Sequence, residues 1–427
     1  MTSTAAWAPG RTLTFRGGRQ VDVAAGPGLL ANLAQGPGLA AHQSRYGDLP
    51  AIGVTQLQSM CERVALDGRG GAGFPFARKL ESAAKAARAA TRLGRAPYVV
   101  VNVSEGEPAS RKDSVLARVA PHLVLDGAAV TARAIGAREV HLVTAADVPE
   151  VGSALRTAVD ERRAPRRDGR LRFSFHDAAP LFVAGQSAAV LQLMAGRPNL
   201  PVTSWQPSTV RGHHGRPTLL SNAETYAHVG RLALLGTPAT VSLGTLEEPG
   251  TTLLTLDGDL SPGAGRAQVM EVGFGTPWPE VLGDRASRPV LLGGYHGAWA
   301  EPGALNGLTV SRLSMADHGL QLGAGVVLPL DTGCPVTRSV GIVDYLAGQS
   351  ARRCGPCFNG LPALAIALRR VAGGEGGTDE VLRLADLVDG RGACAHPDGT
   401  ARLVRSLLTA YAGEVAVHAR GGCGWRR

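Results

Sequence analysis

Apolar positions recur along this chain with two different spacings, and their order predicts the class of fold. Between residues 53 and 178, segments with helical spacing alternate with short apolar runs that are typical of buried strands. The expected helices are 53–66, 76–92, 114–135 and 150–163, and the expected strands are 96–103, 138–145 and 171–178. This alternation predicts a parallel α/β sheet over about residues 60–230.

The pattern changes on either side of this region. "TTLLTLDGDL", "AQVMEVGFGTPWPEVLG" and "RPVLLGGYHGAW" are short strand-like runs broken by Gly and Pro, and they predict a small β-rich domain. The last part of the chain has helical spacing at 338–347, 361–371, 380–388 and 400–412. The N-terminal part holds one candidate strand pair, "RTLTFRGGRQVDV". We therefore expect an extension (1–50), an α/β domain (51–240), a β-rich domain (250–330) and a helical domain (335–427).

Composition narrows the function classes. The net charge of +9 invites a nucleic-acid partner, but only 4% of residues are aromatic and Arg is spread along the chain, so we expect none. The densest basic run, "ERRAPRRDGRLR" (161–172), is interpreted as a solvated loop. No apolar run is long enough to insert into a membrane, and no signal peptide is expected at the N-terminus. Six unevenly placed cysteines favour the cytoplasm.

The segment "GRGGAGFP" (68–75) contains the pattern G-x-G-x-x-G and precedes the expected helix 76–92. The ordinary dinucleotide fingerprint follows a strand, whereas the segment before this loop has helical spacing, so a standard Rossmann NAD site is not expected. Backbone N–H groups, a helix N-terminus and Lys79 would together bind a phosphate. The alternative is a tight turn between domains.

The segment "NVSEGEP" (102–108) follows the expected strand 96–103, at the end where ligands bind in open α/β sheets. Glu105 and Glu107 would there accept hydrogen bonds from the hydroxyl and ring N–H groups of a flavin. They would equally well cap the N-terminus of the next helix. The residues alone leave both interpretations open.

Cys354 and Cys357 form a Cys-x-x-Cys pair in the expected helical domain. A thioredoxin-like dithiol would follow a strand, and a zinc ribbon would need a second such pair; the sequence offers neither. Cys394 lies beyond the next two helical segments, which favours an iron–sulfur site on a helical bundle. Buried structural thiols are the alternative for the pair, and Cys61 is expected in the core.

Five motifs, in this order, are similar to those of one family: "GRGGAGFP…K", "VVVNVSEGEPASRKD…PHLVLDG", "FVAGQSAAVLQLMAGRP", "RPTLLSNAETYAHV" and "CGPCFNG…GACA". Over about residues 55–412 the chain resembles the flavin-bearing, NADH-oxidising subunit of respiratory complex I and the related diaphorase subunits of NAD-linked hydrogenases and formate dehydrogenases. The resemblance implies a Rossmann-like FMN-binding domain, a ubiquitin-like β-grasp domain and a C-terminal helical bundle holding a [4Fe–4S] cluster. It also implies that hydride passes from NADH to FMN and that single electrons leave through the cluster.

The resemblance implies site residues as well. The FMN site would take the glycine loop, the lysine after it and polar residues near three strand ends, namely Gly68, Arg69, Gly70, Gly71, Lys79, Asn102, Glu105, Glu107, Gly185 and Asn222. Phe74 matches an aromatic residue that stacks on NADH. Cys354, Cys357 and Cys394 match ligands of the cluster.

Some positions depart from the family pattern. Gln186 and Ser187 replace two carboxylates beside the nicotinamide and flavin, and Ala351 replaces the first cluster cysteine. Other replaced positions are Leu80, Ser82, Ser104, Ala188 and Ser221. Because a cubane normally has four thiolate ligands, the options for the fourth are Cys423, His396, Cys334, an open iron or a lost cluster. A helix over 337–349 would hold Cys334 roughly 20 Å away.

We therefore expect an oxidoreductase that passes electrons from NAD(P)H through FMN to a [4Fe–4S] cluster. The acceptor would be a ferredoxin-like partner or a membrane-associated, quinone-linked complex. One alternative is a flavoprotein that no longer uses NADH and exchanges electrons only with a ferredoxin-like partner, which Gln186 and Ser187 motivate. Another alternative is a scaffold subunit without cofactors.

Overall fold

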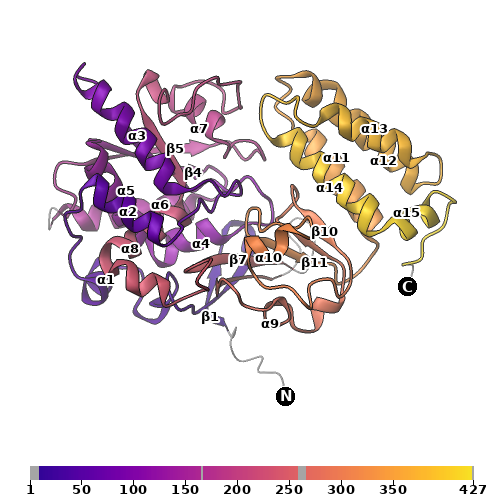
Figure 1. Cartoon of the computed structure of the whole chain (residues 1–427), viewed down its shortest axis with the longest axis horizontal. Coiled ribbons are helices and arrows are strands. Elements are labelled where there is room, and N and C mark those ends of the chain that lie inside the picture. The colour runs from indigo at the N-terminus through magenta and orange to yellow at the C-terminus, as the bar shows by residue number, and fades with distance from the viewer. Residues whose placement is uncertain (1–8, 165–166, 258–265, 426–427) are drawn as a thin grey trace.

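The computed structural model of the protein describes residues 9–164, 167–257 and 266–425. It contains two β-sheets and a group of C-terminal helices, which lie as three neighbouring parts of the molecule in Figure 1. The mixed α/β class with a parallel sheet, predicted from the alternating pattern, is confirmed.

The first sheet has four parallel strands in the order β5-β4-β3-β6. Their bounds are β3 (Tyr98–Asn102), β4 (Glu139–Ala145), β5 (Arg172–Ala178) and β6 (Thr218–Asn222). The central strand β3 reads as a continuous apolar run because helices cover both faces of a parallel sheet, and its three valines are fully buried. Asn102 and Asn222 are register partners, so the carboxyl ends of β3 and β6 lie side by side.

Seven helices accompany this sheet, mostly where the sequence predicts them: α1 (Leu39–Tyr46), α2 (Val54–Arg63), α3 (Phe76–Thr91), α4 (Lys112–Val119), α5 (Pro121–Ile135), α6 (Pro149–Arg163) and α7 (Ser187–Met194). A further long helix, α8 (Ala223–Val241), follows β6 directly. The buried side chain of Cys61 on α2 confirms the core position expected for it.

The single helix expected over 114–135 is wrong, because the chain breaks at Ala120 into α4 and α5. Pro121 at the first turn of α5 lacks the N–H that would continue α4, so the two helices are bent by 95°. No single helix in the described part of the chain is long and apolar enough to cross a membrane, and α4 with α5 passes that test only as this bent pair.

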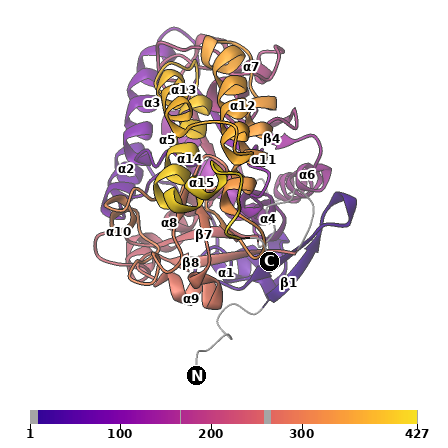
Figure 2. The same ribbon diagram turned by 90° about the vertical axis from the view of Figure 1, so that its right-hand side faces the viewer.

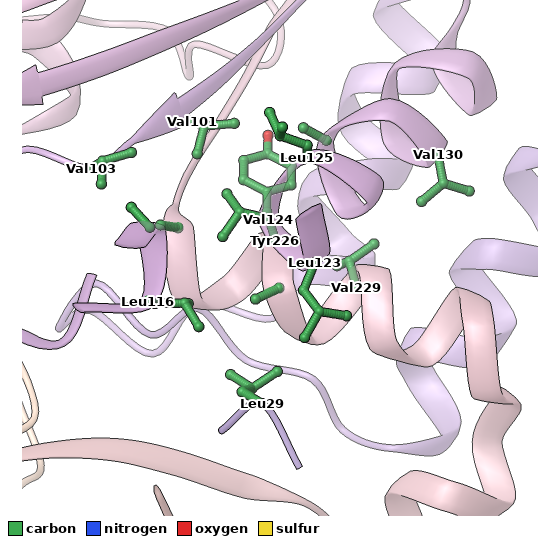
Figure 3. Packing of buried hydrophobic residues seen from close by; sticks show 14 of the residues in the cluster. Leu29, Val101, Val103, Leu116, Leu123, Val124, Leu125, Val130, Tyr226 and Val229 are labelled. Carbon is green, nitrogen blue, oxygen red and sulfur yellow. The ribbon is translucent and has the colours of Figure 1, made fainter. Parts of the chain in front are cut away.

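Helices α5 and α8 pack backbone to backbone in the largest core. A Cβ on Gly127 would lie 1.7 Å from the Tyr226 carbonyl oxygen, and a Cβ on Gly230 would lie 2.3 Å from that of Leu123. Only glycine permits this approach. The surrounding apolar side chains fill the space between the helices and the sheet (Figure 3), including Leu116, Val124, Leu125 and Val229.

The second sheet has the order β1-β2-β8-β7-β11-β9-β10. Its strands are β1 (Pro9–Thr14), β2 (Gln20–Ala24), β7 (Thr251–Leu256), β8 (Ala267–Gly273), β9 (Val290–Leu292), β10 (Ala298–Ala300) and β11 (Val326–Pro329). The predicted N-terminal strand pair is confirmed, and its strand β2 pairs in parallel with β8. Residues 258–265, at the end of one expected strand run, lie outside the described residues.

Two short helices, α9 (Trp278–Leu282) and α10 (Arg312–Ala316), belong to the same part of the chain. The run 267–283, expected as strand, is strand only at its beginning. Pro277 and Pro279 flank the start of α9, where proline is tolerated in a helix but cannot donate in a sheet.

The C-terminal part consists of α11 (Pro335–Gly348), α12 (Leu361–Ala372), α13 (Thr378–Val388), α14 (His396–Ala410) and α15 (Ala412–His418), and Figure 2 shows it from the front. The expected helix 400–412 is thus two helices, which meet at Tyr411. A π-helix, η6 (Pro356–Gly360), precedes α12. Apolar faces of these helices enclose their own core around Leu346, Leu364, Leu368 and Leu407.

The basic run at 161–172 is only in part the solvated loop that the sequence suggests, because Arg163 and Arg172 are exposed whereas the side chains of Arg162 and Arg167 are buried. Arg162 is 1% exposed and donates to Asp126 at 2.7 Å, and Arg167 donates to the same carboxylate at 2.9 Å. The His42 Nε2 atom lies 2.8 Å from Oδ2 of Asp126. The fully buried Asp126 requires charged partners, and two arginines of the run supply them. Residues 165–166 lie outside the described part.

Candidate functional site

The glycine loop, residues 68–73, is a closed turn between α2 and α3. The Gly68 amide donates to the Phe74 carbonyl at 2.9 Å. Gly71 has a φ of 103°, which side-chain-bearing residues rarely adopt. Among the described residues, none accepts a hydrogen bond from the amides of Gly70 and Gly71, so both N–H groups are free to donate to an anion.

The glycine loop reaches the carboxyl edge of the parallel sheet. A Cβ on Gly70 would lie 3.8 Å from the Cβ of Asn222. The Lys79 ammonium donates to the Leu220 carbonyl at 3.3 Å, and burial lowers the pKa of this lysine. Because Asn222 pairs with Asn102, the loop, the lysine and both strand ends come together at the edge where α/β sheets bind ligands.

A buried charge network behind Asn222 was missed in the sequence. Asn222 donates to Asp113 at 3.0 Å, and the Glu224 amide donates to Asp113 at 2.8 Å. Lys112 pairs with Glu224 at 2.7 Å. Burial raises the pKa of Asp113 to about 6, while the neighbouring Lys112 opposes this shift. The sequence offered a signal for this network, since its charged residues lie in the motifs "EPASRKD" and "SNAET".

Glu105 caps the N-terminus of α4. Its carboxylate accepts hydrogen bonds from the Ser110 hydroxyl at 2.6 Å, the Asp113 amide at 3.0 Å, and the amide and hydroxyl of Ser114 at 3.0 and 2.6 Å. Of the two interpretations that the sequence left open, the structure shows helix capping for Glu105.

Glu107 joins the first part of the molecule to the second sheet instead of capping a helix. Its carboxylate accepts from the Tyr295 amide at 2.8 Å and lies against Gly294. The side chain is buried, and burial raises its pKa to about 7 although the Tyr295 and Ala109 amides act in the opposite direction. The carboxyl is therefore held in a weakly polar place between β3 and the loop before β10.

Gly185 fits against the end of β3. The Asn102 side chain donates to its carbonyl at 2.8 Å, and a Cβ at this position would lie 2.8 Å from the Ser104 carbonyl oxygen. The side chain of the next residue, Gln186, lies beside Cys394, where it opposes the rise in the thiol's pKa that burial causes. Residues 185–186 therefore connect the edge of the parallel sheet with the C-terminal helices.

The two remaining residues proposed for the nucleotide site differ in exposure, since Arg69 is buried and Phe74 is exposed. The Arg69 side chain turns away from the loop, donates to the Thr251 carbonyl at 3.2 Å and lies 4.7 Å over the Phe274 ring. Its guanidinium thus contacts the second sheet. Phe74 is 47% exposed, so its ring is accessible for stacking.

The three expected cluster cysteines lie together. Cys354, Cys357 and Cys394 are close enough for their thiols to interact electrostatically. Burial, together with a smaller effect of the neighbouring thiols, raises the pKa of Cys357 to about 12. Ala351, at the position of the missing cysteine, is buried among the same helices.

Two candidates for the fourth cluster ligand, His396 and Cys334, contact groups other than the three cysteines. His396 uses both ring nitrogens, with the Leu346 carbonyl at 2.9 Å and the His296 ring at 3.1 Å. Cys334 lies at the opposite end of α11 from the Cys-x-x-Cys pair, which places it about 20 Å along that helix. Its sulfur lies 3.2 Å from the His418 ring.

A cavity of about 640 Å³ opens beside the 104–108 loop. Glu105, Glu107 and Gly185 line it, together with Arg16 from the N-terminal hairpin. The residues lining it do not include the glycine loop. The sequence-predicted residues therefore surround the end of β3 from two sides.

Two family models match the chain. Residues 61–231 match the Nuo51 FMN-binding domain, and residues 340–418 match the NADH-ubiquinone oxidoreductase-F iron-sulfur binding region. Both cofactor-binding regions are thus those that the motifs indicated.

Comparisons over most of the chain indicate the same family as the two domain models. The chain is 30% identical to the F 2 subunit of NADH-quinone oxidoreductase of Rhizobium meliloti over 83% of this chain and 86% of the relative. It is 26% identical to the F subunit of the Escherichia coli NADH-quinone oxidoreductase over 86% and 85%. An NAD+-reducing [NiFe]-hydrogenase in the H2-reduced state has the same fold, with a TM-score of 0.76 and 22% identity, over 91% of this chain and 66% of that chain. The chain belongs to the family of NADH-quinone oxidoreductase F subunits, with its FMN-binding and iron–sulfur-binding regions.

Proposed function

We propose that this chain takes electrons from a reduced nicotinamide through FMN and passes them through an iron–sulfur cluster to a partner protein. One observation carries the proposal: the two cofactor regions are linked by a short chain of contacts. Gly70 lies against Asn222, Asn222 lies beside Asn102, the Asn102 side chain donates to Gly185, and the next residue, Gln186, lies beside Cys394.

The proposal assigns a role to each part of the molecule. Residues 51–240 would form the Rossmann-like FMN-binding domain, 250–330 the β-grasp domain and 335–427 the helical iron–sulfur domain. The pairing of β2 with β8 attaches the N-terminal hairpin to the β-grasp part. We also propose a cytoplasmic location, which the number and uneven spacing of the six cysteines favour.

The residues at the sheet edge fit a flavin phosphate. Two free amides, of Gly70 and Gly71, and the buried ammonium of Lys79 are donors that an anion would satisfy. An anion beside Lys79 would also favour its charged form, which burial now disfavours. Asn102 and Asn222 would fix the loop on the strand ends, and Phe74 would stack on the nicotinamide nucleotide.

The cysteines fit three of the four positions of a cubane cluster. Cys354, Cys357 and Cys394 would supply thiolates, and Ala351 leaves one iron without a thiolate from the same loop. When bound, FMN couples the two-electron oxidation of a reduced nicotinamide to one-electron steps, and the cluster carries single electrons. The protein supplies position, desolvation and hydrogen bonds.

A second function is favoured by Gln186. This residue replaces a family carboxylate on the nicotinamide side and lies beside Cys394. A flavoprotein that exchanges electrons only with a ferredoxin-like partner would need no nicotinamide site. In either case a partner is implied, because the relatives are named as subunits of larger enzymes.

An anaerobic titration of the purified protein with NADH distinguishes these functions. Prompt bleaching of bound flavin supports the proposal, whereas flavin that stays oxidised until a ferredoxin-like donor is added supports the second function. A preparation without flavin or iron would refute both and leave a scaffold subunit. Cys354→Ala is expected to lose iron, and Cys61→Ala, which removes a core thiol elsewhere, is expected to keep it.

A further inference from the structure

Four side chains with metal-ligating atoms meet at the end of the helical part where α11 begins. They are Cys334, Glu414, His418 and Cys423, and one ligand atom from each lies within 4.8 Å of all the others. We propose that these four residues bind a structural Zn²⁺ ion, separate from the cluster cysteines. The site depends neither on FMN nor on the iron–sulfur cluster.

The spacing of the ligand atoms fits a tetrahedral site. The Cys334 sulfur lies 3.2 Å from His418 Nε2 and 3.5 Å from Glu414 Oε1, and that oxygen lies 3.2 Å from His418 Nε2. With Zn–S of about 2.3 Å and Zn–N or Zn–O of about 2.0–2.1 Å, a tetrahedral site separates N from O by about 3.3–3.4 Å and S from N or O by about 3.5–3.6 Å. The three measured separations lie within about 0.4 Å of these values, so small side-chain shifts complete the geometry.

Neighbouring backbone groups orient the ligands. His418 Nδ1 lies 2.9 Å from the Ala372 carbonyl, and the hydrogen bond it donates there leaves Nε2 free to bind a metal. The Gly424 amide donates to Glu414 at 3.0 Å. Cys334 is the N-cap residue of α11, so the helix that follows fixes its backbone. Each of these contacts helps to hold a ligand in place.

The ligands come from separate segments, as in closed structural sites. Cys334 stands at the start of α11, Glu414 and His418 lie one turn apart on α15, and Cys423 follows α15 in the chain. Cys334 and His418 are buried. Four protein ligands leave no open position for substrate, so the ion would fasten the tail to the first helix of the bundle.

The donor set identifies the metal. Two thiolates, an imidazole and a carboxylate are typical zinc ligands, whereas Ca²⁺ and Mg²⁺ take oxygen ligands only. A [4Fe–4S] cluster prefers thiolates throughout. The competing chemistry is a disulfide between Cys334 and Cys423, both of which are free in this structure.

Elemental analysis of the full-length protein, purified anaerobically without chelator, tests the proposal. We expect about one zinc ion per wild-type chain. Cys423→Ser and His418→Ala should lose the zinc, and the control Cys394→Ser should keep it. Circular dichroism of Cys423→Ser reports that the chain is folded. If His418→Ala is insoluble, Cys423→Ser alone decides, because Cys423 lies on the tail.

Cobalt substitution supplies a second readout. After removal of zinc, addition of Co²⁺ to the wild-type chain should give the visible absorption of a tetrahedral site with thiolate ligands, and Cys423→Ser should not. Zinc that stays in Cys423→Ser would overturn the proposal. A wild-type chain that binds no zinc with Cys334 and Cys423 reduced would overturn it too, as would a native Cys334–Cys423 disulfide.

Discussion

Glu107 should make the stability of the protein depend on pH between about 4.5 and 7. Burial raises its pKa from the ordinary value of 4.5 to about 7. The protonated carboxyl is therefore favoured in the folded state. This contribution to stability is complete below pH 4.5 and is lost as the pH rises through about 7.

The magnitude follows from the two pKa values. Between them, each pH unit changes the free energy of unfolding by about 1.4 kcal/mol. Over the whole interval the wild-type chain should thus lose about 3 kcal/mol at this group. Glu107→Gln stays neutral at every pH and still accepts from the Tyr295 amide, so it should lack this loss.

Urea unfolding at several pH values between 4.5 and 8, followed by fluorescence and circular dichroism, measures the effect. The free energy of unfolding of Glu107→Gln, relative to wild type, should rise by about 3 kcal/mol from the acidic to the neutral end. Glu247→Gln, which changes an exposed carboxyl in the same way, should show no such rise. Parallel pH profiles for wild type and Glu107→Gln would refute the assigned protonation of this carboxyl.

Three further predictions concern other parts of the molecule. Lys79→Met should weaken FMN retention by about 10-fold or more, because a hydrogen bond to a charged group is worth about 1.5–3 kcal/mol. Dialysis followed by flavin fluorescence measures the retained FMN. Lys85→Met, which changes an exposed lysine, should leave FMN retention unchanged. Gly127→Ala should destabilise the chain by about 3 kcal/mol or more in denaturant unfolding, because its Cβ would collide with the Tyr226 carbonyl. The matched Gly341→Ala, on a helix with open space around it, should be neutral or slightly stabilising, and equal effects of the two would contradict the packing of α5 on α8. Zinc chelation should lower the melting temperature of wild type and leave that of Cys423→Ser unchanged, as scanning calorimetry would show.

Much of the fold could be predicted because strong local patterns decide it. The buried runs around Val100 and Leu142 and the helical segments between them identify the parallel sheet. The break at Ala120 was missed although Pro121 is visible in the sequence, because apolar spacing continues through it. The burial of Arg162 was missed because its partner Asp126 is 36 residues away.

The candidate site could be predicted as a set of residues but not as a set of contacts. The glycine loop, Asn102 and Asn222 meet where the motifs indicated, since strand order brings their ends together. That Glu105 caps a helix while Glu107 contacts the second sheet depends on tertiary packing. The contact between Cys334 and His418 could not be predicted, because the two residues are 84 positions apart in the chain. The spacing E-x₃-H-x₄-C of Glu414, His418 and Cys423 is nevertheless a metal-binding pattern that can be recognised in the sequence.

Electron paramagnetic resonance after anaerobic addition of NADH tests most directly whether flavin and cysteines form one electron path. We predict that wild-type protein bleaches its flavin and develops the signal of a reduced iron–sulfur cluster. In Cys394→Ala the flavin should still bleach while that signal is absent. Loaded wild-type protein whose flavin is reduced by NADH with no cluster signal, or whose cluster signal persists in Cys394→Ala, would contradict the proposed path.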